Sequence, residues 1–167
     1  MKNKLLIVVN MQSEFITGSE QAQAIVPNVR AKIEEYIRQG DYIIFTSDEH
    51  RTVGLNFQSS NNKAQTADIH AHLDENCINC KYINKPNFGW INWETNISNS
   101  IVKDIEEIEL IGLTTDISVV TNAFILKTSF PEMKITVDAS CCAGVSEESH
   151  KAALLTMQMC EINIVMA

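Results

Sequence analysis

The stretch "EIELIGLTTDISVVT" (residues 107–121) shows how the chain is built. Its apolar first part predicts a β-strand that ends at Gly112, and its second part predicts a helix that begins near Ser118 and ends near Lys127. A strand followed directly by a helix is the repeating unit of an α/β sheet. Ser118 would lie in the first turn of that helix, where free backbone N–H groups stabilise negative charge. It is therefore a candidate nucleophile, and a helix cap is the structural alternative.

Five other short apolar runs, rich in Ile and Val, have the character of strands. They cover residues 5–10, 41–47, 80–85, 134–138 and 162–166. Because the runs are almost continuously apolar, they are typical of strands buried on both faces, as in parallel sheets.

Helical patterns fill most of the segments between these runs. In residues 24–40 an apolar residue recurs every four positions, Pro27 suits an early helical position, and Gly40 suits the residue after the helix. Further helices are expected over residues 93–105 and 146–159. This alternation predicts a single domain over residues 1–167, with a three-layer, doubly wound α/β fold and a six-stranded, mainly parallel sheet.

The composition narrows the classes of partner. The chain of 167 residues has 21 acidic and 13 basic side chains and a net charge of −8, which argues against binding to a nucleic-acid backbone. No run approaches the roughly 18 apolar residues that span a bilayer, and the N-terminus lacks the cleavage pattern of a signal peptide. We therefore expect a cytoplasmic protein that contacts neither membrane nor nucleic acid, with its five cysteines reduced.

Three irregular stretches, residues 11–23, 48–79 and 86–92, each begin at the end of a predicted strand. In an open α/β sheet, ligands bind outside the carboxyl ends of the strands. We therefore expect the polar residues at these ends to form one site: Asn10, Asp48, Lys85 and the turn over residues 114–118.

Three motifs carry a resemblance to a known family. They are "VVNMQSEF" (residues 8–15), "INKPNFGW" (83–90) and "GLTTDISVVTNA" (112–123). In this order and spacing they resemble the isochorismatase-like cysteine hydrolases, which include nicotinamidases. The resemblance extends to residues 40–50, 67–73 and 137–157. It implies the strand order 3-2-1-4-5-6, a homodimer or homotetramer, and a small-molecule ligand.

The catalytic triad that the resemblance implies is altered in this chain. The family's aspartate falls on Asn10 and its second acidic position on Glu14, its lysine matches Lys85, and its cysteine falls on Ser118. A serine hydroxyl needs a base to take its proton, and the carboxamide of Asn10 is not basic. If Lys85 is shielded from water and lacks a carboxylate partner, its pKa would fall, and it could form a Ser–Lys dyad with Ser118.

Several functions are therefore compatible with the sequence. The first is a divergent hydrolase of a small amide or a related C–N or C–O substrate, with Asn10, Lys85 and Ser118 at the catalytic positions. The second is an inactive relative that binds a small planar carboxylate or amide. A third alternative is that positions 10 and 118 were altered from the Asp and Cys of an active enzyme.

By the same resemblance, the backbone N–H groups of Thr114 and Ser118 would form an oxyanion hole, with a cis peptide bond between Leu113 and Thr114. Thr115 and Asp116 would brace this turn. Aromatic residues in the strand-end loops could stack on a planar ligand, and Phe15 and Trp90 match family positions near the substrate. Core or lid packing is the alternative role. The remaining aromatic candidates are Phe57, Phe88 and Trp93.

No metal or other cofactor is expected. Nicotinamidases carry an Asp-x-His and further histidines after the second strand, and Asp48 and His50 match the first two, but Asn56 stands near the next expected position. Two ligands do not complete a site that needs three or more. His70 and His72 match a family stretch outside that metal set. The C-x-x-C motif "CINC" (residues 77–80) has no second pair at a suitable spacing, so we assign it no function.

Overall fold

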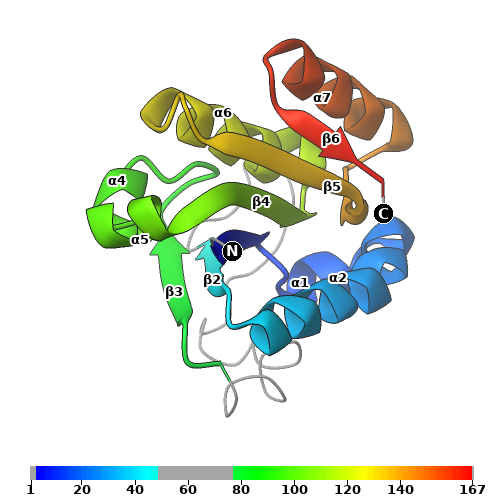
Figure 1. The fold of residues 1–167 in the computed structure, drawn as a ribbon. Helices are drawn as coiled ribbons and strands as arrows, with labels where there is room; N and C mark the ends of the chain where they lie inside the picture. Colours follow the sequence, from blue (N-terminus) through cyan, green and yellow to red (C-terminus); the bar gives the residue numbers. More distant parts are fainter. Residues whose placement is uncertain (1–2, 49–76, 167) are drawn as a thin grey trace.

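The computed structural model describes residues 3–48 and 77–166. Six strands run through them (Figure 1): β1 (Asn3–Val9), β2 (Tyr42–Asp48), β3 (Cys80–Lys85), β4 (Ile105–Leu113), β5 (Lys134–Ala143) and β6 (Asn163–Val165). The helices are α1 (Ser13–Thr17), α2 (Glu20–Gln39), α4 (Trp93–Asn96), α5 (Asn99–Asp104), a π-helical turn η1 (Thr115–Val119), α6 (Val120–Ser129) and α7 (Glu147–Met159).

The strands form one sheet in the order β3-β2-β1-β4-β5-β6. Every pair of neighbouring strands is parallel, so the predicted fold class and strand order are confirmed, and "mainly parallel" becomes wholly parallel within the described residues. No described helix is both long and apolar enough to span a bilayer.

Helices cover both faces of the sheet and make a three-layer domain. Along β1, Leu5, Ile7 and Val9 belong to the core on one face, and Leu6 and Val8 belong to the core on the other. The first core includes buried side chains of α4, α6 and α7, and the second includes those of α2. Figure 1 shows α6 and α7 on one side of the sheet and α2 on the opposite side. Because both faces are buried, the strands read as continuous apolar runs.

Several helix boundaries differ from the sequence prediction. α2 begins at Glu20, where the Ser19 side chain accepts a hydrogen bond from the N–H of Ala22, so Pro27 lies inside the helix rather than near its start. The segment expected as one helix over residues 93–105 is two short helices, α4 and α5. α7 has the expected start. Ser146 caps it, and Ser149, the third helical residue, completes a capping box.

The thiols of the C-x-x-C motif are not reduced. Cys77 and Cys80 form a disulfide at the start of β3, which corrects the expectation of five free cysteines. Cys141 and Cys142 are free and buried in β5, and burial raises the pKa of the Cys141 thiol to about 11. A thiol with a raised pKa is a poor nucleophile at neutral pH. Burial likewise raises the pKa of the Cys142 thiol, so neither of these two β5 residues is a candidate nucleophile.

Acid should destabilise the domain partly through Glu107, a buried residue of β4. Burial raises its pKa, but hydrogen bonds and ion pairs from Thr136, Lys134 and Lys4 outweigh this effect and lower the pKa from its usual 4.5 to about 2. A carboxylate with a lowered pKa in the folded state stabilises the fold above pH 4.5, and this stability is lost as the pH falls toward 2. In urea unfolding, Glu107→Gln should therefore flatten the loss of stability between these pH values.

The matched control for that experiment is Glu106→Gln, since Glu106 is the exposed neighbour on the same strand. Its acid profile should follow that of the parent chain. Equal slopes for Glu107→Gln and the parent would contradict the assignment.

Candidate active site

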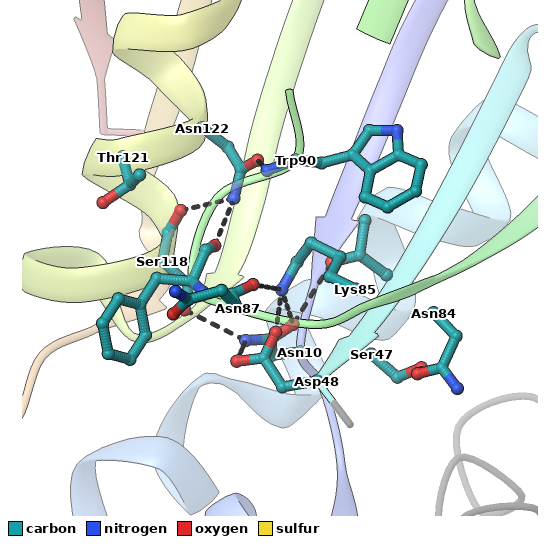
Figure 2. Close-up of polar contacts among 12 residues, drawn as sticks. Asn10, Ser47, Asp48, Asn84, Lys85, Asn87, Trp90, Ser118, Thr121 and Asn122 are labelled. Atoms are coloured by element: carbon teal, nitrogen blue, oxygen red, sulfur yellow. Dashed lines mark hydrogen bonds and ion pairs between the residues drawn. The ribbon is translucent and has the colours of Figure 1, made fainter. Parts of the chain in front are cut away.

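Asn10 lies at the centre of a buried polar cluster at the carboxyl ends of β1, β2 and β3 (Figure 2). It follows β1 directly and has a positive φ of 49°, a conformation that asparagine tolerates better than most residues. Its Nδ2 donates to Asp48 Oδ2 at 2.7 Å and to Ser118 Oγ at 3.1 Å. Its Oδ1 accepts from Lys85 Nζ at 3.0 Å and from Thr46 Oγ1 at 3.2 Å.

Lys85 is fully buried at the end of β3 and has acceptors on several sides. Its ammonium forms an ion pair with Asp48 Oδ1, donates to Asn10 Oδ1 at 3.0 Å, and donates more weakly to the carbonyl of Asn87 at 3.4 Å. The sequence suggested that Asn10 would leave this lysine without a carboxylate partner. That expectation is wrong, because Asp48 supplies the carboxylate from the neighbouring strand.

Burial acts on both members of the ion pair. It lowers the pKa of Lys85, and the charge and hydrogen bond of Asp48 oppose this effect. It also raises the pKa of Asp48, against the contributions of Lys85 and Asn10. Both directions reflect the cost of keeping charges away from water. The pair is therefore sensitive to the loss of either partner.

Ser118 lies inside the π-helical turn η1 rather than at the first position of α6. It is buried, and its Oγ accepts the hydrogen bond from Asn10 Nδ2. No side-chain cap bond is found at the start of η1 or α6, so the structure does not give Ser118 the role of a helix cap. Among the hydrogen bonds of residues 3–48 and 77–166, none joins Ser118 to Lys85.

The backbone that leads into this turn has the form expected from the sequence. The peptide bond between Leu113 and Thr114 is cis, and Gly112 before it has a φ of 115°. Asp116 accepts hydrogen bonds from the N–H of Val145 and from the Ser149 hydroxyl. These contacts tie the turn to the start of α7.

Thr115 is also anchored to α7. Its Oγ1 lies 2.8 Å from His150 Nδ1, and it is completely buried. Burial lowers the pKa of His150, which favours the neutral imidazole. Thr115 and Asp116 therefore both brace the turn against the start of α7, as expected.

Asn122 is a positioning residue that the sequence analysis missed. This fully buried side chain of α6 donates from Nδ2 to the carbonyls of Ser118 (2.7 Å) and Phe88 (2.9 Å). Its Oδ1 accepts from the N–H of Trp90 at 2.9 Å and from Trp93 Nε1 at 3.3 Å. It fixes the loop after β3 against the Ser118 turn. The sequence signal was an amide directly before the apolar stretch at residues 123–126.

A small pocket opens beside Ser118. The described residues that line it are Asn10, Phe15, Asp48, Phe88, Leu113, Thr114, Ile117, Ser118 and Val145. Phe15, Thr114 and Ser118 thus line one pocket, and their predicted roles in substrate binding and in an oxyanion hole stay predictions. Trp90 is not among the described lining residues: its indole donates to Asn96 Oδ1 at 2.8 Å and packs against the core. The second aromatic wall is Phe88, two residues earlier in the same loop.

The chemistry of Asp48 bears on the expected absence of metal. Both of its oxygens are engaged, one by Lys85 and one by Asn10. Within residues 3–48 and 77–166, no three His, Cys, Asp or Glu side chains form a group suited to a metal ion. His50, Asn56, Phe57, His70 and His72 lie outside the described residues, so the expectation of no metal stays a prediction.

Comparisons with known proteins agree with this architecture. A nicotinamidase of Bacillus subtilis superposes with a TM-score of 0.79 at 21% identity, over 99% of each chain. A pyrazinamidase/nicotinamidase of Streptococcus mutans gives 0.78 at 23% identity, over 98% of this chain and 100% of that one. The MAR1 ribonuclease of Caenorhabditis elegans gives 0.74 at 15% identity, over 99% of this chain and 77% of that one.

At these identities the superpositions show the fold alone. A comparison with curated proteins finds no significant match. Residues 4–166 match the family described as the isochorismatase domain, which covers nearly the whole chain. The chain therefore belongs to the isochorismatase family of hydrolases.

Proposed function

We propose that this member of a hydrolase family binds a small planar carboxylate or amide beside Ser118 and does not turn the amide over. The observation that carries the proposal is the hydrogen bond from Asn10 Nδ2 to Ser118 Oγ, 3.1 Å long. A nucleophilic hydroxyl must give its proton to a base. Here the neighbouring side chain, Asn10, donates a hydrogen bond to Ser118 Oγ and cannot take its proton.

The class of ligand follows from the pocket. Phe15 and Phe88 provide aromatic surface for a flat ring, and the turn at Thr114 provides backbone polar groups beside it. Several structural neighbours are named as nicotinamidases, which act on an amide of an aromatic ring. Nicotinamide and its acid, nicotinate, are therefore suitable probes of the pocket.

A second candidate is slow hydrolysis through a Ser118 ester. Burial lowers the pKa of Lys85, which favours a neutral amine that could act as a base. Asp48 opposes this effect, and Asn10 lies between the lysine and the serine. The geometry therefore supports binding more strongly than turnover.

Other properties stay proposals. We expect a homodimer or homotetramer in the cytoplasm that contacts neither nucleic acid nor membrane. Mass measurement in solution, by light scattering, tests the oligomeric state.

Binding without turnover can be tested with one ligand series. Nicotinate or nicotinamide should raise the melting temperature of the protein progressively with concentration, because a ligand that binds only the folded state stabilises it by RT ln(1 + [L]/Kd). Ammonia release from nicotinamide should stay at background. Phe88→Ala should reduce the shift, whereas Trp90→Phe, at a position outside the described lining residues, should not.

Two results would count against the proposal. A panel of small aromatic amides and acids that never shifts the melting temperature would show that the pocket does not bind this class. Ammonia release that Ser118→Ala abolishes would establish the second candidate instead.

A further inference from the structure

The chemistry of its neighbours fixes the orientation of the Asn10 carboxamide. A lysine ammonium can only donate hydrogen bonds and a carboxylate can only accept them. The oxygen of Asn10 must therefore face Lys85, at 3.0 Å, and its nitrogen must face Asp48, at 2.7 Å. The reverse orientation would place a donor against a donor and an acceptor against an acceptor.

This orientation also fixes the contact with Ser118. The nitrogen of Asn10 has two protons, and one goes to Asp48 Oδ2. The other points to Ser118 Oγ, at 3.1 Å. The position of the carboxylate at residue 48 thus makes position 10 a donor to the serine.

We propose that Asp48, the carboxylate partner of Lys85, fixes the orientation of Asn10 and thereby makes Asn10 a hydrogen-bond donor to Ser118. Asp48 is then a positioning residue that acts through Asn10. The inference deepens the proposed function and rests on it for its catalytic meaning, because it explains why Ser118 receives a hydrogen-bond donor. The pairing of charges itself concerns only Asp48, Lys85 and Asn10.

In this cluster one ammonium, that of Lys85, balances one carboxylate, that of Asp48. A second one, introduced by Asn10→Asp, would bring two negative oxygens together where Asn10 Nδ2 and Asp48 Oδ2 are now 2.7 Å apart. Exchanging the two residues, in N10D/D48N, avoids this repulsion. The bond between positions 10 and 48 reverses its direction, and Lys85 keeps one carboxylate, at the oxygen position it already contacts at 3.0 Å.

A double-mutant cycle of thermal stability tests this role of Asp48. D48N should lower the melting temperature by roughly 10 °C, because a buried ammonium loses its counter-ion while the shape of the side chain is kept. N10D should also lower it, through like-charge contact. The exchanged variant N10D/D48N should recover most of either loss, which a purely steric role of Asp48 would not produce.

A second background and a control complete the design. In K85M, which removes the cation, D48N should raise the melting temperature instead of lowering it, since the carboxylate is then the unpaired buried charge. The control E147Q removes the carboxylate of an exposed ion pair with Lys151 and should change the melting temperature little.

Two outcomes would overturn the inference: D48N as stable as the parent chain, or N10D/D48N no more stable than D48N. If D48N fails to fold, N10D/D48N decides, because folded protein supports this role of Asp48 and unfolded protein refutes it. No ligand is present in this cycle, so a failed binding experiment would leave its result intact.

Discussion

The triple variant N10D/D48N/S118C is expected to hydrolyse a small aromatic amide at least about 10³-fold faster than the parent chain. The exchange places a carboxylate at position 10. The introduced thiol takes the place of Ser118 Oγ, which receives a hydrogen bond from Asn10 in the parent chain, so the carboxylate can accept the proton of the thiol. The thiolate would attack the amide carbon and form a thioester as the amine leaves with a proton. Water would then release the acid.

Two further parts of the site bear on this reaction. Lys85 would keep one carboxylate partner, and Thr114 and residue 118, the predicted donors of an oxyanion hole, line the same pocket. Steady-state release of ammonia, with its sensitivity to iodoacetamide, is the measurement.

Partial variants separate the contributions. S118C alone should gain little, because Asn10 still donates to the nucleophile. N10D/S118C should gain less than the triple variant, since it crowds two carboxylates around one ammonium. A triple variant that folds and binds a small amide but is no faster than the parent would show that the pocket itself has diverged.

Gly112→Ala is expected to destabilise the fold by about 4 kcal/mol or more, enough to prevent folding at moderate temperature. Gly112 has a φ of 115°, and a Cβ atom there would lie 2.1 Å from the carbonyl oxygen of Val9 on β1. The Val9 oxygen and the Gly112 Cα, from which the Cβ projects, both belong to the backbone of central strands, so neither can move without disturbing the sheet. Urea unfolding monitored by circular dichroism measures the loss.

Gly40→Ala is the matched control for this experiment. Gly40 also has a positive φ, of 75°, but a Cβ atom there would meet nothing within 4 Å. It should therefore cost only about 1–2 kcal/mol, the penalty of the left-handed conformation itself. Similar losses for both variants would show that the approach of Val9 to Gly112 is not the cause.

The fold was predictable because its signals are local and repeated. In β1, β2, β4 and β5 the central residues are buried whichever face they point to, whereas the edge strands β3 and β6 are partly exposed. Helix starts were less accessible, because the Ser19 cap that begins α2 lies outside the apolar repeat. The π-helical form of η1 has no local sequence pattern that distinguishes it from the first turn of a helix.

The placement of the site residues was also accessible from sequence, because parallel strands bring their carboxyl ends to one edge. Asn10, Asp48, Lys85 and Ser118 meet there as expected. For the aromatic residues of the pocket, the sequence predicted Phe15 and Trp90. Phe88, on the same short loop as Trp90, is the second aromatic residue among the described lining residues. Which of them faces the pocket depends on how Asn122 holds that loop from another helix.

The sequence by itself predicted the parallel α/β fold from residue type and spacing. Its resemblance to the isochorismatase-like hydrolases pointed to the family and predicted that Asn10 and Ser118 stand at the positions of the family's Asp and Cys. Only the tertiary structure decided where the remaining negative charge lies. Asp48 and Lys85 are neighbours through the pairing of β2 with β3, and they enclose Asn10 from two strands at once. The direction of the Asn10 hydrogen bonds follows from that three-dimensional arrangement of charge, which no local pattern encodes.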